Sequence, residues 1–209
     1  STQIFHAGAL FAGTATRAHM DVVENLAPGN GSSSPQQLAV VGTRLYFSAS
    51  TPGTGRETWR LTASRDGIEA VDQVRPGSDS SDPQQFCMAD SRVFFSAKDD
   101  STWRSLWVWD ESSVSNCLSG LARNPDVDEV TALGDTVLFV RTDNSGDREL
   151  WRYTTSSGAK PVTNINTTAS SAPASLTLAG NYVYFSAYTG SSRGLWRTDG
   201  TTVTSMDAA

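Results

Sequence analysis

The sequence predicts an all-β fold in which a unit of four antiparallel strands repeats along the chain. Three observations support this prediction: a short apolar motif recurs at nearly equal spacing, a tryptophan follows each copy, and turn residues separate segments of alternating apolar and polar residues. The motif reads YFSA at 46–49, FFSA at 94–97, LFVR at 138–141 and YFSA at 184–187, and the tryptophans are Trp59, Trp107, Trp151 and Trp196. Their spacings of 48, 44 and 45 residues are typical of four-stranded β-propeller blades.

The repeat divides the chain into four full units and one partial unit, which we expect to form a single domain. The partial unit spans residues 1–29, and Phe11 in it lies 48 residues before Trp59. The predicted fold is a five-bladed β-propeller with an incomplete first blade, or a part of a larger array of blades. The full units span residues 30–77, 78–123, 124–165 and 166–209.

The first two strands of each unit are expected to form a hairpin. Two-residue turns of Gly, Asp, Asn, Ser and Thr join them, and Gly, Asp and Asn supply the positive φ that primed hairpin turns need. Strand two carries the apolar motif, whose alternation puts the shared phenylalanine on one face and its apolar neighbour on the other. Both faces are therefore expected to be covered. Strand one is expected at 38–41, 86–89, 130–133 and 176–179, and the shared phenylalanines are Phe47, Phe95, Phe139 and Phe185.

Strand three contains the repeated tryptophan, and strand four is expected to be a shorter and more polar edge strand. Segments 149–152 and 194–197 are examples of strand three, and segments 67–74 and 201–206 are examples of strand four. A loop rich in Pro, Gly and Ser, such as 76–83, then leads to the next unit. Short links within units and long links between them are what blades and their crossovers require.

The strand-three segments resemble a known repeat. Residues 193–201 read RGLWRTDGT and residues 148–151 read RELW, which is similar to the repeat of bacterial surface proteins called ELWxxDGT repeat proteins. The other copies depart from the second half of this pattern, with ASRDG at 63–67 and DESS at 110–113. The resemblance implies an exported, propeller-like array of repeats and implies no particular chemistry.

Charge and composition limit the classes of partner. The net charge is −6 and the sequence pI is about 4.8, so the chain lacks the basic surface that neutralises phosphates, and we expect neither nucleic acid nor membrane insertion. A first residue other than Met, few lysines and many Ser and Thr favour a secreted or cell-surface protein. Asn30 and Asn166 begin N-glycosylation sequons and are the candidate glycan attachment sites.

The aromatic residues offer two interpretations. The repeated tryptophans form either a series of sugar-stacking platforms or, as we favour, the packing between blades, since a residue that recurs once per unit is usually core. Trp103 and Trp109 lie outside the repeat pattern. These two residues are therefore the better candidates for ligand binding, although Trp109 also suits a packing role.

Arginines recur three residues before each tryptophan. Arg104, Arg148 and Arg193 are candidates for binding sulfated or carboxylated glycans, because a guanidinium group recognises such anions with paired hydrogen bonds. The alternative, which we favour, is a structural role in which they pair with loop acids or stack on aromatic rings. Arg56 occupies the same position in the first full unit.

One loop has the spacing of a cation site. Asp143, Ser145, Asp147 and Glu149 offer oxygen ligands at alternating positions that can surround Ca²⁺, whereas the equivalent loops 51–55 and 189–192 contain no acids. The alternative is an ordinary turn. No other cofactor is expected, and His6 and His19 are not placed for a metal site or a catalytic triad.

These features predict a non-catalytic extracellular binding module with lectin-like carbohydrate recognition. The alternative is a structural or adhesive component of an extracellular assembly, with protein partners or further copies of the chain bound at exposed strand edges. A glycosidase is the third possibility, because acids gathered from different blades leave no local motif. Cys87 and Cys117 are expected to be unpaired and partly buried, because strand one and strand four of a blade lie too far apart for a disulfide.

Overall fold

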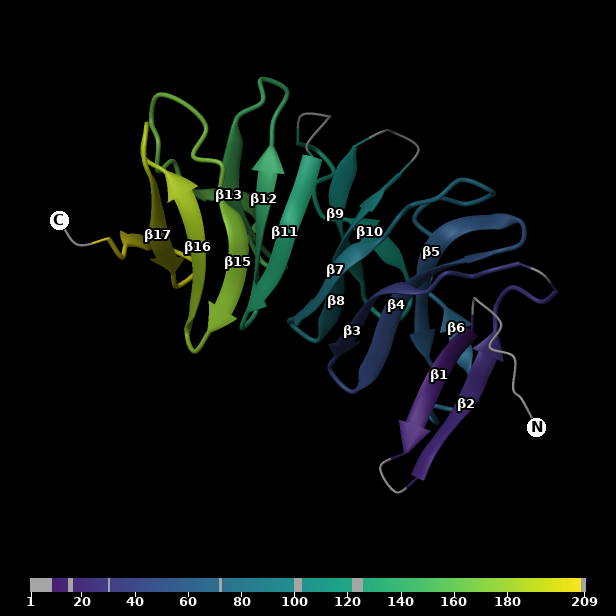
Figure 1. Cartoon of the computed structure of the whole chain (residues 1–209). Helices are drawn as coiled ribbons and strands as arrows, with labels where there is room; N and C mark the ends of the chain where they lie inside the picture. Colours follow the sequence, from purple (N-terminus) through teal and green to yellow (C-terminus); the bar gives the residue numbers. More distant parts are fainter. Residues whose placement is uncertain are drawn as a thin grey trace. The chain divides into compact units, whose positions relative to one another are not determined.

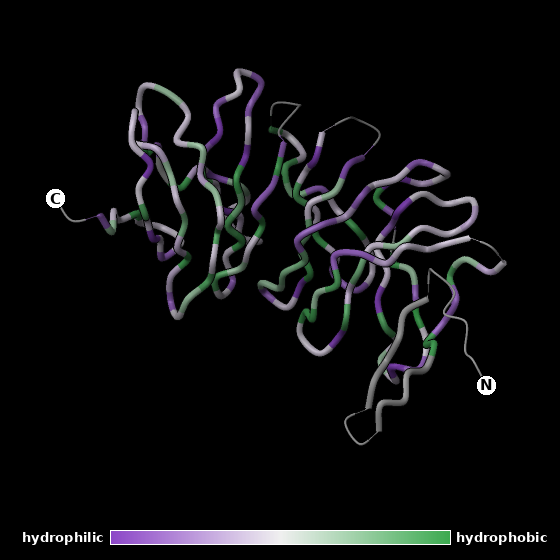
Figure 2. Tube along the Cα trace, in the orientation of Figure 1, coloured by the Kyte–Doolittle hydropathy of each residue, from purple (hydrophilic) through white to green (hydrophobic). Residues whose placement is uncertain are grey.

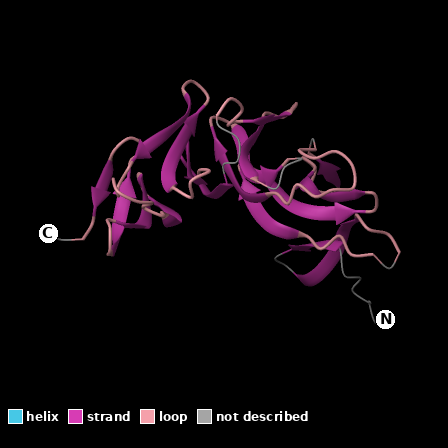
Figure 3. Ribbon diagram, turned by 90° about the horizontal axis from the view of Figure 1, so that it is seen from above, coloured by secondary structure: helices cyan, strands magenta, loops and turns pink. Residues whose placement is uncertain are grey.

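The computed structural model describes residues 9–14, 17–29, 31–71, 73–99, 103–121 and 126–207. Within these residues all the regular secondary structure is β-strand (Figure 1, Figure 3). The contacts divide the chain into two compact units, residues 1–84 and 85–209, where the sequence predicts one domain. The boundary falls at the start of the second four-stranded sheet, so each unit contains whole sheets apart from one terminal residue.

The first unit contains a two-stranded sheet and one four-stranded sheet. Strands β1 (Ala9–Thr14) and β2 (Arg17–Asn25) pair antiparallel, which gives the predicted partial repeat two strands. The first four-stranded sheet has the order β3-β4-β5-β6, so each strand pairs with the next along the chain. Its strands are β3 (Gln36–Val41), β4 (Arg44–Thr51), β5 (Thr54–Leu61) and β6 (Ile68–Ala70).

The second unit contains three more sheets with the same order of strands. The four-stranded antiparallel sheets predicted from the repeat are therefore confirmed. The second sheet has β7 (Gln84–Ala89), β8 (Arg92–Lys98), β9 (Arg104–Trp109) and β10 (Val114–Asn116); the third has β11 (Asp126–Leu133), β12 (Thr136–Thr142), β13 (Arg148–Thr154) and β14 (Gly158–Thr163); the fourth has β15 (Ala174–Ala179), β16 (Tyr182–Tyr188), β17 (Arg193–Thr198) and β18 (Val203–Ser205).

Strand one of each sheet differs from the prediction because it starts earlier and contains an extra residue. The register shifts between Gln36 and Ala39, between Asp128 and Thr131, and between Ala174 and Thr177, which are β-bulges. The bulged residues have positive φ although none is glycine, and for this reason the turn chemistry of the sequence did not reveal them. They are Gln37 (φ 56°), Glu129 (φ 54°) and Ser175 (φ 63°), and Gln85 (φ 59°) takes the same position in β7.

Strand four is shorter than predicted. The segments 67–74 and 201–206 contain only the three-residue strands β6 and β18. Polar turns precede both strands: in the last one, Asp199 accepts hydrogen bonds from the backbone N–H groups of Thr201 and Thr202 at 2.9 and 2.8 Å. These bonds hold the backbone in a turn, so the residues that precede Val203 do not join the ladder.

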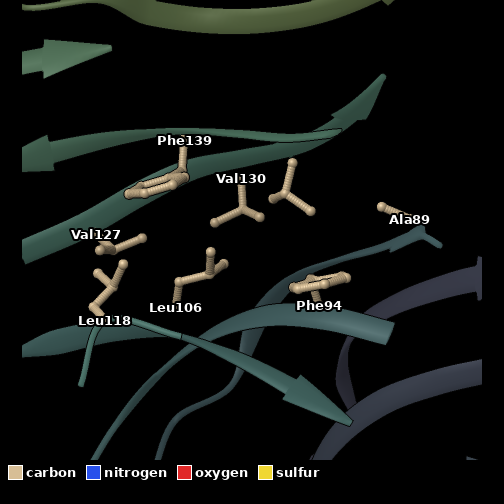
Figure 4. Close-up of a cluster of buried hydrophobic side chains, with 8 residues drawn as sticks. Ala89, Phe94, Leu106, Leu118, Val127, Val130 and Phe139 are labelled. Atoms are coloured by element: carbon tan, nitrogen blue, oxygen red, sulfur yellow. The ribbon is translucent and has the colours of Figure 1, made fainter. Parts of the chain in front are cut away.

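The apolar core of the second unit lies between its sheets. Phe94 and Leu106 of the second sheet pack against Val127 and Phe139 of the third (Figure 4). The ring of Phe94 also lies 5.6 Å from the ring of Tyr153, centroid to centroid. In the second and third sheets strand two is thus covered on both faces, as the sequence predicts, whereas Tyr188 of β16 is 37% exposed. Hydrophobic residues accordingly follow these inner strands, whereas the hairpin that joins β12 and β13 is hydrophilic (Figure 2).

The repeated tryptophans take part in this packing. Trp151 lies against the cluster between the second and third sheets, and Trp196 lies against the cluster between the third and fourth. Trp59 packs on Phe47 within the first unit, and its indole N–H donates to the carbonyl of Ala49 at 3.2 Å. Three of the four repeated tryptophans thus have the predicted packing role, and the indole N–H of Trp107 donates to the carbonyl of Ala97 at 3.0 Å.

The two cysteines are unpaired, as predicted. Cys87 lies on β7 and Cys117 directly follows β10, at opposite edges of the second sheet, and both pack against its apolar cluster. Burial raises the pKa of each thiol to about 12, because the thiolate would lose its hydration.

We expect both thiols to be unreactive in the folded chain. At about pH 8 a thiol with a pKa near 12 is almost entirely protonated, and the thiolate is the reactive form. The measurement is the rate of labelling by a disulfide reagent with and without denaturant. Rapid labelling of the folded chain would contradict the burial of these residues.

Trp151→Ala should lower the free energy of unfolding by roughly 3–5 kcal/mol, as large-to-small changes in a core do. The measurement is urea unfolding followed by circular dichroism. Trp103→Ala is the matched control, because Trp103 is 43% exposed and its loss should cost within about 0.5 kcal/mol. Equal destabilisation by the two variants would argue against a packing role for Trp151.

Candidate functional site

A polar hollow of about 380 Å³ lies at one end of the third sheet. One wall is the hairpin between β12 and β13, and the other is the loop between β14 and β15. Hydroxyl, amide and carboxylate groups dominate its described lining, which includes no aromatic side chain. The lining residues are Ser145, Gly146, Asp147, Asn164, Asn166, Thr167, Thr168, Ala169 and Ser170.

The hairpin wall is held in shape by Asp143. One carboxylate oxygen, Oδ1, accepts hydrogen bonds from the backbone and hydroxyl of Ser145 at 2.8 and 2.6 Å and from the backbone N–H of Asp147 at 3.1 Å. These bonds, that of the Ser145 hydroxyl first, lower the pKa of Asp143 below its ordinary value. Gly146, with φ 84°, closes the turn, which therefore presents Ser145 and Asp147 in a fixed geometry.

The loop wall is held in shape by Asn166. Its side-chain oxygen accepts hydrogen bonds from the backbone and hydroxyl of Thr168 at 3.3 and 3.0 Å, and its amide nitrogen donates to the carbonyl of Ser170 at 3.4 Å. The residue is only 6% exposed. Asn166 is thus a structural residue of the loop, and its neighbours Thr167 and Thr168 line the hollow.

A buried carboxylate joins the two walls. Glu149 of β13 accepts hydrogen bonds from the backbone N–H of Ser171, at 2.7 Å, and from the Ser171 hydroxyl. Burial raises the pKa of Glu149, the bonds from Ser171 oppose that rise, and the charge of Asp147 adds to it. The same bond recurs in the first unit, where Ser81 donates to Glu57 from its backbone and hydroxyl at 3.0 and 2.6 Å. This carboxylate–serine pair therefore ties strand three to the outgoing loop in both units.

The hollow exists because of the residue that precedes the repeated arginine. In the first sheet that residue is Gly55, whose N–H donates to the carbonyl of Gly77 at 3.4 Å. A Cβ atom at Gly55 would lie 2.2 Å from the backbone oxygen of Asp79, so there the outgoing loop fills the space. In the third sheet the corresponding residue is Asp147, whose side chain lines an open hollow instead. The sequence shows that Gly55 is replaced by Asp147 in the third sheet. Only the close contact at Gly55 shows that this replacement separates a filled space from an open one.

The first unit contains a second hollow, of about 330 Å³, near the turn between β3 and β4. Its charged group Arg44 donates to Glu69 at 2.9 Å, and the guanidinium of Arg60 lies 2.7 Å from the same carboxylate. Arg44 and Arg60 therefore share one carboxylate, and Arg65 adds a further positive charge to the lining. The lining residues are Thr43, Arg44, Leu45, Leu61, Thr62, Ala63 and Arg65.

Comparison with solved structures identifies the fold, although no protein-family model matches the chain and no curated protein matches it by sequence. The crystal structure of TolB from Acinetobacter baumannii aligns with a TM-score of 0.56 and 15% identity over 93% of this chain and 47% of that protein. The β-propeller domain of the Trilobed protease from Pyrococcus furiosus aligns with a TM-score of 0.55 and 14% identity over 82% of this chain and 51% of that one. A putative TolB from Agrobacterium tumefaciens gives a TM-score of 0.54 and 13% identity over 91% and 66%.

The fold is that of a β-propeller. Each four-stranded sheet corresponds to one blade, which confirms the predicted fold class. The chain spans about half the length of the A. baumannii and P. furiosus propeller proteins. The described residues contain no helix long and apolar enough to span a membrane.

The predicted calcium ligands of this propeller do not converge. Asp143 binds its own hairpin, and Glu149 binds Ser171. Among the described residues, no three acidic, histidine or cysteine side chains are grouped closely enough to hold a metal ion. The acidic spacing of this loop therefore has the geometry of a turn. His6 lies outside the described residues.

The predicted ligand-binding arginines are engaged within their own sheets. Arg104 donates to the carbonyl of Ser96 at 3.3 Å, and Arg193 donates to the carbonyl of Ala172 at 2.9 Å. Arg148 binds Asp128 at 2.6 Å and the carbonyl of Pro173 at 3.2 Å. This geometry favours the structural alternative, in which each arginine ties strand three to strand two or to the start of strand one.

The remaining predicted site residues are not brought together. Trp109 is 7% exposed and packed within its sheet, so a ligand cannot stack on its ring, whereas Trp103 is exposed. Asn166 lies in the hollow wall, is 6% exposed and donates to the carbonyl of Ser170. Its glycosylation therefore stays a prediction, and Asn30 lies outside the described residues.

The raised pKa of Glu149 gives the stability a defined pH dependence. The folded chain holds a proton at Glu149 more tightly than the unfolded chain, where the pKa is near 4.5, so its contribution to stability is lost as the pH rises from about 4.5 through the raised pKa. Glu149→Gln removes the ionisable group and with it this loss of stability at higher pH. The free energy of unfolding of the variant, measured by urea unfolding, should therefore increase relative to that of the wild type as the pH rises from about 4 to 7.

Glu57→Gln repeats this test in the first unit. The stability of this variant relative to the wild type should also increase as the pH rises, because burial also raises the pKa of Glu57. A difference between variant and wild type that stays constant or falls with rising pH would show that neither carboxylate carries a raised pKa.

Proposed function

We propose that this chain is a non-catalytic, carbohydrate-binding module of an exported β-propeller, and that the polar hollow of the third sheet binds the sugar. The observation that carries the proposal is the hollow itself, a space lined by hydroxyl, amide and carboxylate groups. Its volume of about 380 Å³ lies within the range of ~300–1,000 Å³ that is usual for small-molecule sites. Sugars present many hydroxyl groups, so such a lining satisfies them with hydrogen bonds.

Asp147 is the central residue of the proposed site. It is half-buried and lines the hollow from the hairpin wall. An ionised carboxylate accepts strong hydrogen bonds from hydroxyl groups, and it contributes most where water is partly excluded. Ser145 and Thr167 stand on either side, one on each wall of the hollow. A sugar hydroxyl pair directed at Asp147 would therefore find further donors and acceptors on both walls.

Charge favours a neutral glycan. The chain has a net charge of −6, and Asp147 adds a negative group to the hollow. The arginines that the sequence suggested for anionic glycans are used within the sheets. A sulfated or carboxylated sugar would meet repulsion at Asp147 without a cation in the described lining to offset it.

The test is a glycan array followed by calorimetric titration of the best neutral sugar, with competition by free sugar. Asp147→Gly gives the third sheet the residue that the first sheet has at Gly55, and Asp147→Asn removes the charge with little change in shape. Losing one hydrogen bond to a charged group costs about 1.5–3 kcal/mol, so both variants should bind roughly 10- to 100-fold more weakly.

The matched control is Asp135→Asn, which changes an acid in the turn between β11 and β12 of the same sheet. Its affinity should equal that of the wild type. Trp103→Ala tests the separate prediction that this exposed ring stacks on a sugar. Loss of binding in Trp103→Ala with unchanged binding in both Asp147 variants would reject the hollow as the site, and no bound glycan at millimolar protein would reject the function.

A further inference from the structure

The hollow of the first unit has two arginines and no acid in its described lining. Arg44 is the first residue of β4, and Arg65 lies in the turn between β5 and β6. Leu45 and Leu61 add apolar side chains to the same lining. Its volume of about 330 Å³ lies within the range of ~300–1,000 Å³ that is usual for small-molecule sites. The hollow is therefore a space of ligand size whose only charged lining groups are cations.

The second sheet is neutralised at the same place. Asp90, in the turn between β7 and β8, binds Arg92, the first residue of strand two, at 2.5 Å. Asp110 begins the turn between β9 and β10. The first sheet has Gly42 in place of Asp90 and has Thr62 in place of Asp110. These two replacements remove the acids from the turns that line the hollow.

Arg44 keeps donors that no residue of the sheet uses. Its Nη1 donates to Glu69 at 2.9 Å, and Arg60 lies 2.7 Å from the same carboxylate oxygen, so two guanidinium groups share one acid. A guanidinium group has five N–H donors, and within the described part of the chain only Nη1 of Arg44 has a partner. The remaining donors are available to a ligand.

Arg65 is not bound by the nearby acids. Within the described part of the chain its guanidinium group has no hydrogen bond or ion pair, and the residue is exposed. Asp66 accepts hydrogen bonds from the hydroxyl groups of Thr62, at 3.1 Å, and Ser64 instead. Glu24 of β2 accepts a hydrogen bond from the backbone of β6 at 2.9 Å. An anion that enters the hollow therefore meets a cation that no acid occupies.

We propose that this hollow binds an oxyanion, a carboxylate or a sulfate, carried by a body the size of one sugar ring. A guanidinium group pairs with such anions by two parallel hydrogen bonds, and Arg44 and Arg65 offer one such group from each turn. Leu45 and Leu61 give the C–H groups of a ring an apolar surface to contact. The anion follows from the arginines, whereas the choice of a sugar as its carrier rests on the proposed function.

Arg65→Gly separates ligand binding from folding. Arg65 has φ 64°, a left-handed conformation that glycine adopts without strain, so the variant removes the cation and leaves the thermal midpoint unchanged or raised. Arg44→Gln is the second variant, and Arg60 still binds Glu69 in it. Arg75→Gly is the matched control, because it removes another cation of the first unit, which binds Asp79 at 2.8 Å.

Calorimetric titration of the 209-residue chain at low salt tests the proposal, with glucuronate, a sulfated glucose and inorganic sulfate as the probes. Losing a hydrogen bond to a charged group should weaken binding of the acidic sugars about 10-fold or more in Arg65→Gly and in Arg44→Gln, whereas Arg75→Gly should bind as the wild type does. Added salt should weaken binding, since the arginines are accessible to solvent. The tighter of the two acidic sugars identifies the anionic group.

Two outcomes would overturn the proposal: no binding of either acidic sugar at millimolar concentration, or binding that neither Arg65→Gly nor Arg44→Gln weakens. Inorganic sulfate that binds as tightly as the sulfated glucose would reject a sugar as the carrier. Asp147→Gly should bind the acidic sugars as the wild type does, and Arg65→Gly should retain any binding of a neutral sugar. Failure of this site and failure of the hollow in the third sheet are therefore distinguishable.

Discussion

The structure depends on one constraint: the second strand of every four-stranded sheet is apolar on both faces. A sheet with two apolar faces is stable in water only when something covers each of them, so the sheets must stack. Phe94 and Phe139 show how this constraint is met, since they come from different sheets and pack in one cluster. The tryptophan on strand three completes that cluster at its side. Stacking of sheets through their flat faces is the defining architecture of a propeller.

Polar ties complement this packing at the ends of the sheets. In the first and third sheets, the arginine and the glutamate that precede the repeated tryptophan make different contacts. The arginine holds strand two or the loop that enters strand one, and the glutamate holds the loop that leaves the sheet. A buried carboxylate is costly unless hydrogen bonds satisfy it, and a serine provides two such bonds for Glu57 and for Glu149. The loops are therefore fixed by the same residues that make the repeat recognisable.

The candidate site is a local departure from this regularity. At the position where the first sheet has Gly55, backbone fills the space beside the strand, whereas at Asp147 a hollow remains. The second and fourth sheets also depart from the repeat, with Ser105 and Gly194 in place of the glutamate. The function is proposed at Asp147, where the repeat differs from itself, because regular positions are already occupied by packing or hydrogen bonds.

The sequence by itself determined the repeat, the four strands of each sheet, the packing role of the tryptophans and the unpaired cysteines. These features follow from period, alternation and turn chemistry, which are local or recur at fixed spacing. Only the tertiary structure decided where the bulges lie, such as that at Gln37, and which partners the polar side chains bind. The spacing of Asp143 to Glu149 suits a cation, yet Asp143 and Glu149 each accept hydrogen bonds from nearer donors. Whether a polar side chain faces a ligand or a neighbouring loop depends on contacts between distant segments, and sequence spacing does not encode them.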